Sequence, residues 1–147
     1  MSPKFLLHAV AIVVLPIAAA LAQAGAPASV TVKLSDGDNG EMSMSLSPSK
    51  VTAGPVEFTI KNESHTMKHE FLILPWTGSD TALPYDAKTQ QVAEEKLNRL
   101  QGVEDLSPRE TVTARFTLKQ GRYLVFCNEP GHYRDAMRAS LLVSGAK

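Results

Sequence analysis

The chain has 147 residues, with 15 basic side chains, 15 acidic side chains and a single cysteine. This is the length of one ordinary domain, large enough to bury a core without cross-links. The balanced charge argues against nucleic acid or an acidic membrane surface as the partner, and a single cysteine excludes an internal disulfide.

The N-terminal 22 residues have the pattern of a cleaved signal peptide. Lys4 precedes a long apolar run without acidic residues, and this run ends in Ala20-Leu21-Ala22, a small-residue cleavage site. Ala22-Gln23-Ala24 fits a cleavage site almost equally well, and an uncleaved membrane anchor is the alternative because the run is close to spanning length. We therefore expect a periplasmic or otherwise exported protein, without a membrane span after cleavage, whose residues 23–29 form a flexible lead-in.

Most of the remaining chain alternates between apolar and polar residues, which is typical of half-buried strands. The alternation begins at residues 30–34. Similar alternation predicts strands at residues 42–46, 56–60 and 111–118, and short apolar runs predict strands at residues 71–74, 123–126 and 139–143. Met42 and Met44 alternate with serines, so we expect them to pack inward rather than to bind Cu(I). About seven short strands separated by turns predict an all-β sandwich or barrel with antiparallel and mixed pairs.

Residues 75–107 interrupt this pattern. Proline and glycine make the first part a loop, and Asp86 has the position of an N-cap for a helix that ends near Gly102. The apolar stripe of this helix would consist of Val92, Leu97 and Leu100. We expect a surface helix that crosses from one sheet to the other and that could shield one side of the site described next.

The most informative stretch is residues 123–137, YLVFCNEPGHYRDAM, which contains Cys127, His132 and Met137. A thiolate, an imidazole and a thioether form a copper ligand set that lacks one histidine. A turn at Pro130-Gly131 would fold the histidine back toward the sulfur. Each residue alone is more often an ordinary core or surface residue, but the combination at this spacing is specific for a metal site.

The second imidazole must come from upstream. His8 lies in the leader, which leaves His65 and His69. Both share a strand face with Phe71, so alternation alone does not choose between them. Position favours His69, which is contiguous with the apolar strand, whereas His65 follows a polar turn and is retained as a neighbour of the site together with Met67.

These residues resemble the cupredoxins, in particular the plastocyanin/azurin-like and the rusticyanin- or sulfocyanin-like proteins. The resemblance rests on the C-x4-H-x4-M pattern around the Pro-Gly-His turn and on the upstream histidine in MKHEF. It implies a Greek-key β-sandwich over residues 30–147, with a loop-plus-helix insertion at residues 75–107. It also implies one copper ion that alternates between Cu(I) and Cu(II). The implied ligands are His69, Cys127 and His132 in the equatorial plane and Met137 as the axial ligand.

The chain departs from the family pattern at one position. Many members have an asparagine after the first histidine, hydrogen-bonded near the cysteine loop, but this chain has Glu70. The hydrogen bonds around the copper set its potential and colour, so neither property is carried over from the family.

A four-ligand site of this kind leaves no open position for substrate, which argues against an enzyme. We therefore expect a monomeric one-electron carrier that passes electrons between redox partner proteins. In the family, electrons pass through the exposed histidine of the C-terminal loop, which implies a docking surface at His132, Pro130 and Tyr133 of this chain. The alternative is a module that buffers or delivers copper, favoured by Glu70 and by the nearby His65 and Met67.

Overall fold

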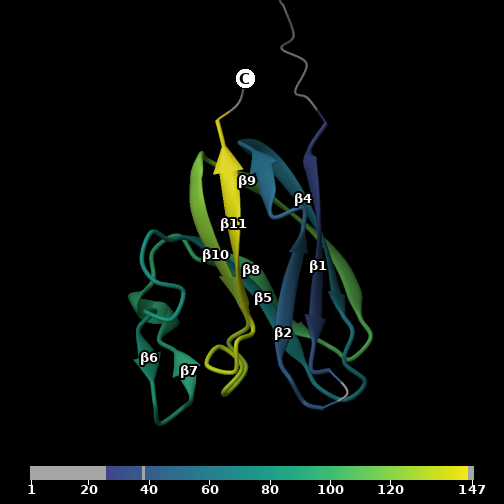
Figure 1. Cartoon of the computed structure of the whole chain (residues 1–147), viewed down its shortest axis with the longest axis vertical. Helices are drawn as coiled ribbons and strands as arrows, with labels where there is room; N and C mark the ends of the chain where they lie inside the picture. The colour runs from purple at the N-terminus through teal and green to yellow at the C-terminus, as the bar shows by residue number, and fades with distance from the viewer. Residues whose placement is uncertain (1–25, 38, 146–147) are drawn as a thin grey trace, which may run out of the picture.

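The computed structural model describes residues 26–37 and 39–145 and consists of two main sheets packed face to face (Figure 1). The first sheet has the order β2-β1-β4-β9 and the second has the order β3-β11-β10-β5-β8. The strands of the first sheet are β1 (Ala28–Ser35), β2 (Ser43–Ser47), β4 (Gly54–Asn62) and β9 (Thr111–Leu118). Those of the second are β3 (Lys50–Thr52), β5 (His69–Pro75), β8 (Gln101–Leu106), β10 (Gly121–Phe126) and β11 (Arg138–Ser144).

The pairing within the sheets is mixed. β1 pairs with β4, and β3 with β11, in parallel, whereas the other neighbours in the two main sheets are antiparallel. The chain changes sheet after β2, β3, β4, β8 and β9, so consecutive strands are often not neighbours. This arrangement confirms the predicted all-β sandwich. The predicted signal peptide at residues 1–22 lies outside the described residues, and within them no helix has the length and apolar character needed to cross a membrane.

Alternate side chains of the two sheets fill the space between them. Phe58 of β4 is fully buried, and its ring lies 5.1 Å from that of Phe71 and 5.8 Å from that of Phe116, measured between centroids. Met44 is buried in the same core and Met42 packs against it, which confirms that these methionines pack inward. The core therefore extends to β5, the strand that begins with His69.

The second sheet is buried on both faces at its centre. Residues 71–74 of β5 and 123–126 of β10 are all buried, which explains why both read as continuous apolar runs rather than as alternating ones. The outer side chains of these strands pack against apolar residues of the insertion, among them Leu83 and Val92. The insertion thus forms a third layer beside β10 and β11, on the side away from the first sheet (Figure 1).

The helix predicted over residues 86–102 is wrong. The insertion instead contains a short hairpin of β6 (Tyr85–Asp86) and β7 (Gln91–Val92), followed by the 3₁₀ turn η1 (Glu94–Lys96). Gln90 and Arg99 adopt positive φ angles of 59° and 58°, which a right-handed helix does not allow. Val92 is buried, and Leu97 and Leu100 pack beside it, on the outer face of the second sheet instead of forming a helical stripe.

Gly102, the expected helix end, lies inside β8 opposite Leu72 of β5. A Cβ atom at this position would lie 2.4 Å from the carbonyl oxygen of Phe71, so the close approach of β8 to β5 requires glycine here. The second half of the insertion is therefore an edge strand next to the strand that carries His69.

Candidate metal centre

Two of the predicted ligands lie at neighbouring strand ends, and a third lies on the loop that follows one of them. His69 is the first residue of β5, and Cys127 directly follows β10. Because β5 and β10 pair antiparallel, the start of one and the end of the other meet at one end of the sheet. His132 lies on the loop from Cys127 to β11, which returns toward the sheet at Gly131, where φ is +88°.

The donor atoms of these three residues converge on one point. The Nδ1 atoms of His69 and His132 are 3.2 Å apart, and the Sγ atom of Cys127 lies 4.0 Å from the first and 3.5 Å from the second. A triangle with these sides has its centre about 2.1 Å from each corner, within the usual range of about 2.0–2.3 Å for metal–nitrogen and metal–sulfur bonds. The spacing of the three donors therefore fits a single metal ion.

Met137 is held beside them by the backbone. The N–H of Cys127 donates to the Met137 carbonyl at 3.0 Å, and the N–H of Met137 donates to the His132 carbonyl at 3.0 Å. The Met137 side chain is fully buried and belongs to the same core cluster as Cys127. All four predicted ligands thus lie at one end of the sandwich.

Burial disfavours the charged form of both imidazoles. It lowers the pKa of His69 to about 4, with a smaller effect from the neighbouring His132, and it also lowers the pKa of His132. Neutral rings have free lone pairs to offer a metal. Burial raises the pKa of the Cys127 thiol to about 12, although the backbone N–H groups of Glu129 and Glu70 oppose this change. The thiol is therefore protonated without a metal, and a bound cation would displace that proton.

His69 has one nitrogen without a partner. Among the buried side-chain nitrogen and oxygen atoms of the described residues, His69 Nε2 is the one that makes no hydrogen bond. Such a group costs free energy, and a metal ion bound at Nδ1 would not satisfy it. The ring is oriented by packing so that Nδ1, the other nitrogen, faces Cys127 and His132.

The loop before His69 is fixed by buried polar groups. Asn62 donates from Nδ2 to the carbonyls of Met67, Leu106 and Ser107, at 2.9–3.0 Å. Ser64 accepts from the N–H groups of Thr66 and Met67. His65 is exposed on this loop and lies 2.8 Å from the Arg109 guanidinium, so it is not brought to the other donors.

Glu70, the next residue after His69, contacts the cysteine loop with both its side chain and its backbone. Its carboxylate accepts the N–H of Asn128 at 3.2 Å, and its own N–H donates to Cys127 Sγ at 3.2 Å. Burial, together with the nearby Glu129 and Glu94, raises the pKa of Glu70 to about 7. The Glu70 side chain therefore makes a hydrogen bond to the cysteine loop, at the backbone of Asn128.

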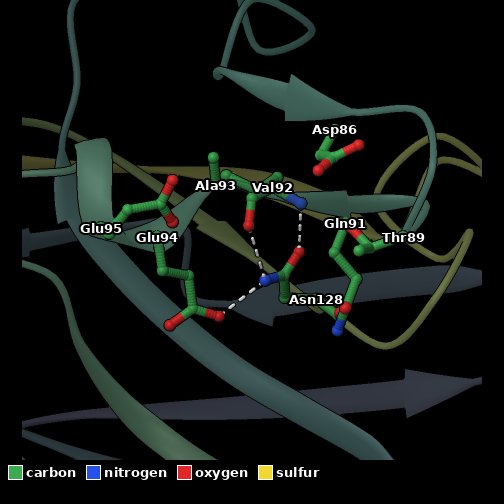
Figure 2. Close-up of a pocket in the computed structure, with 8 residues that line it drawn as sticks. All are labelled: Asp86, Thr89, Gln91, Val92, Ala93, Glu94, Glu95 and Asn128. Atoms are coloured by element: carbon green, nitrogen blue, oxygen red, sulfur yellow. Dashed lines mark hydrogen bonds between the residues drawn. The ribbon is translucent and has the colours of Figure 1, made fainter.

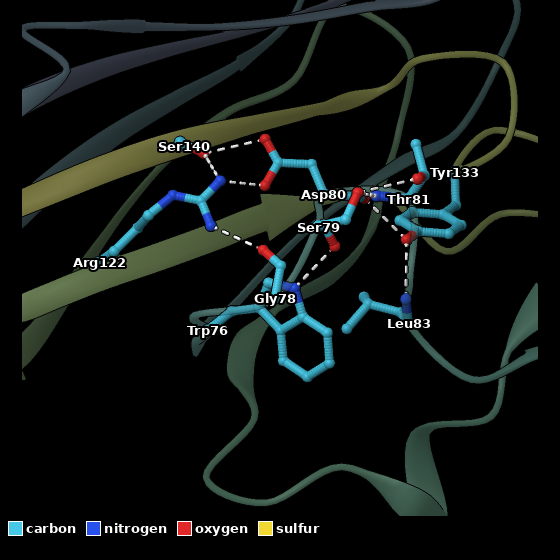
Figure 3. Close-up of polar contacts among 9 residues, drawn as sticks. All are labelled: Trp76, Gly78, Ser79, Asp80, Thr81, Leu83, Arg122, Tyr133 and Ser140. Carbon is cyan, nitrogen blue, oxygen red and sulfur yellow. Dashed lines mark hydrogen bonds and ion pairs between the residues drawn. The ribbon is translucent and has the colours of Figure 1, made fainter.

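Tyr133 does not lie on the surface, so its predicted place in a docking surface is wrong. It is 1% exposed, and its ring packs edge-on against Phe126. Its hydroxyl donates to the Asp80 carbonyl at 2.7 Å and accepts the Leu83 N–H at 3.1 Å (Figure 3). Pro130 is exposed and His132 is partly exposed, so these two remain at the surface.

Figure 3 also shows polar contacts that the sequence did not indicate. The Arg122 guanidinium donates to the Asp80 carboxylate, the Gly78 carbonyl and the Ser140 hydroxyl. Arg122 lies at least 18 positions from each of these partners, so no local sequence pattern indicates the contacts. The network ties the start of the insertion to β10 and β11.

Asn128 is a second residue that the sequence did not single out. It lies beside a cavity of about 290 Å³ between the insertion and the cysteine loop (Figure 2). The other lining residues are Asp86, Thr89, Gln91, Val92, Ala93, Glu94 and Glu95. Its side chain is buried and fully hydrogen-bonded to the insertion.

The chain folds as a cupredoxin-like sandwich, and its His-Cys-His group fits a single copper ion. Similar solved structures include auracyanins and rusticyanins. Reduced auracyanin from Roseiflexus castenholzii is 20% identical, with a TM-score of 0.55, covering 82% of this chain and 99% of that one. Rusticyanin from Thiobacillus ferrooxidans is 16% identical, with a TM-score of 0.60, covering 79% and 76%. Auracyanin B is 20% identical, with a TM-score of 0.56, covering 81% and 91%. No protein-family model and no curated protein matches the sequence.

Proposed function

We propose that this chain is an exported, monomeric type 1 copper protein that carries single electrons between redox partners. The observation that supports this best is the convergence of two imidazole nitrogens and one cysteine sulfur within 4.0 Å of one another at one end of the sandwich. Its export rests on the predicted signal peptide at residues 1–22.

In this proposal His69, Cys127 and His132 hold the copper ion and Met137 is the axial ligand. A bound copper ion supplies a one-electron couple, Cu(I)/Cu(II), that suits this mixture of soft sulfur and imidazole donors. His69 and Cys127 are anchored at the ends of doubly buried strands, so they change position little between the two charge states. Four protein donors leave no position for a substrate, in keeping with a carrier rather than an enzyme.

Loading the mature protein with one equivalent of Cu(II) tests this function. We expect an intense visible thiolate-to-copper absorption band, a type 1 EPR spectrum and a reversible reduction potential in voltammetry. A faint d–d spectrum without the intense band would contradict the proposal, because it would mean that the thiolate is not a ligand.

Electron exchange is proposed to occur at His132, the one partly exposed member of the donor group, beside the exposed Pro130. In Pro130→Glu, two copies that approach through this surface would place like charges together. We expect electron self-exchange, measured by NMR line broadening on mixed oxidised and reduced protein, to slow by about tenfold, since such juxtaposition costs more than about 1.4 kcal/mol.

The matched control is Thr52→Glu, which introduces the same charge at an exposed position of β3, away from the donor loop. It should leave the exchange rate at the wild-type value, and both variants should retain the wild-type spectrum. Equal exchange rates in wild type and Pro130→Glu would rule out this surface.

A second candidate function is copper buffering or delivery, favoured by a specific observation. His65 and Met67 are both exposed on the loop that leads into His69, and Met67 is 40% exposed. A soft thioether and an imidazole there could receive or release Cu(I). Rapid transfer of Cu(I) to a chelator, slowed in a His65→Ala/Met67→Ala double variant, would favour delivery; fast self-exchange with slow metal release would favour the carrier.

A further inference from the structure

The segment between Cys127 and His132 is attached to the insertion by several hydrogen bonds. Asn128 Oδ1 accepts the Val92 N–H at 2.6 Å, and Asn128 Nδ2 donates to the Val92 carbonyl at 3.1 Å (Figure 2). The same Nδ2 donates to Glu94 Oε1 at 2.6 Å. The amide side chain thus pairs with the backbone of Val92 as a neighbouring strand would.

Two further bonds join the same pieces of chain. Gln91 Nε2 donates to the Asn128 carbonyl at 2.9 Å, and the Gly131 N–H donates to the Gln90 carbonyl at 2.8 Å. Residues 90–94 therefore hold both ends of the segment 128–131, which lies between two of the converging donors. Val92 in turn is buried in the apolar layer over the second sheet, so the attachment point is itself fixed.

From this geometry we infer that Asn128 is a positioning residue that locks the loop carrying His132 to the insertion, so that the donor group is preformed without metal. This inference rests on the proposed function for its purpose, because a preformed site loses less order when it binds a metal and changes less when its charge changes. The lock acts through the backbone of Gln90 and Val92 and the side chains of Gln91 and Glu94, and Asn128 itself donates no group to the metal.

The first test needs no copper. In Asn128→Ala the amide hydrogens of Val92 and Gly131 should exchange with solvent about tenfold faster in the metal-free protein, measured by NMR, because the hairpin opens locally. Tyr123→Phe is the matched control, since it removes two hydrogen bonds of a buried side chain, to the backbone of Lys119, at the other end of β10. It should leave exchange at Val92 and Gly131 unchanged.

The second test uses copper as the probe. The copper-loaded Asn128→Ala protein should show a broadened or mixed type 1 EPR spectrum, a shifted reduction potential and faster copper release to a chelator, whereas Tyr123→Phe should match wild type. Glu94→Ala should move the same readouts in the same direction to a smaller extent. Glu94→Gln, which retains an oxygen acceptor for Asn128 Nδ2, should restore the wild-type EPR line shape and rate of copper release.

Unchanged amide exchange at Gly131 together with an unchanged spectrum in folded Asn128→Ala would overturn the inference. If that variant does not fold, the Glu94→Ala and Glu94→Gln pair decides in its place, and identical behaviour of the two would overturn it. If the wild-type protein lacked the intense copper band, only the proposed function would be contradicted. Amide exchange in the metal-free protein would still test whether Asn128 holds the loop.

Discussion

Replacing Cys127 by serine is expected to abolish the intense visible absorption of the copper-loaded protein completely. The band requires a thiolate bound to Cu(II), and Cys127 is the only cysteine. Serine is similar in size and its hydroxyl can still accept the Glu70 N–H that now lies 3.2 Å from the sulfur, so the sandwich should fold without copper. Visible absorption and EPR on the loaded variant, with circular dichroism on the metal-free variant, measure both expectations.

His65→Ala is the control for this experiment. His65 is exposed and lies against Arg109, apart from the converging donors, so its removal should leave the band intact. Loss of the band in His65→Ala would mean that His65, and not His69, supplies the second imidazole. An identical spectrum in wild type and Cys127→Ser would remove the thiolate from the site altogether.

Phe58→Ala is expected to cause the largest loss of stability. Phe58 is fully buried between the sheets and contacts both Phe71 and Phe116, so truncation removes apolar contacts and leaves a cavity. The free energy of unfolding of the metal-free protein should fall by about 3–5 kcal/mol. Against a total of about 5–15 kcal/mol for a typical domain, this would leave much of the population unfolded in mild denaturant.

Urea unfolding monitored by circular dichroism measures this loss. Phe116→Ala is the matched control, because Phe116 packs against the same cluster but is only partly buried, and its loss should be clearly smaller. Equal losses in the two variants would contradict the view that the core is centred on Phe58.

The sequence predicted the strands and the donor residues best where the local signal was strong. Residues 30–34 and 56–60 alternate because one face of their sheet packs against the other sheet. The observed strands β1 and β4 contain these two runs. The spacing around Cys127 and His132 limits the loop to a turn that brings the two together. His69 could be preferred to His65 because it lies directly before the apolar run of residues 71–74, so it was expected to be buried with that strand.

The insertion was predicted poorly for a physical reason. Its residues have helical propensity, but Val92, Leu97 and Leu100 gain more by covering the outer face of β5 and β10 than by forming a helix with few apolar contacts. β3 has only three residues, which is too short for an alternating pattern to be detected. β8 contains Gly102, which the close approach to β5 requires, and a glycine in the sequence indicates the end of an element rather than the interior of a strand. The burial of Tyr133 was missed because its hydrogen-bond partners, Asp80 and Leu83, lie about 50 positions earlier.

The parallel pairing of β3 with β11 has a consequence for the order of folding. It joins residues 50–52 to residues 142–144, so the chain must close a loop of roughly 90 residues before this contact is gained. His69, Cys127 and His132 all lie inside that loop. Contacts so distant along the chain form slowly, so we expect the β3–β11 pairing to be among the last to form. The pairing of β5 with β10, which brings His69 to Cys127, closes a shorter loop, so the donors can come together before the edge of the second sheet is complete.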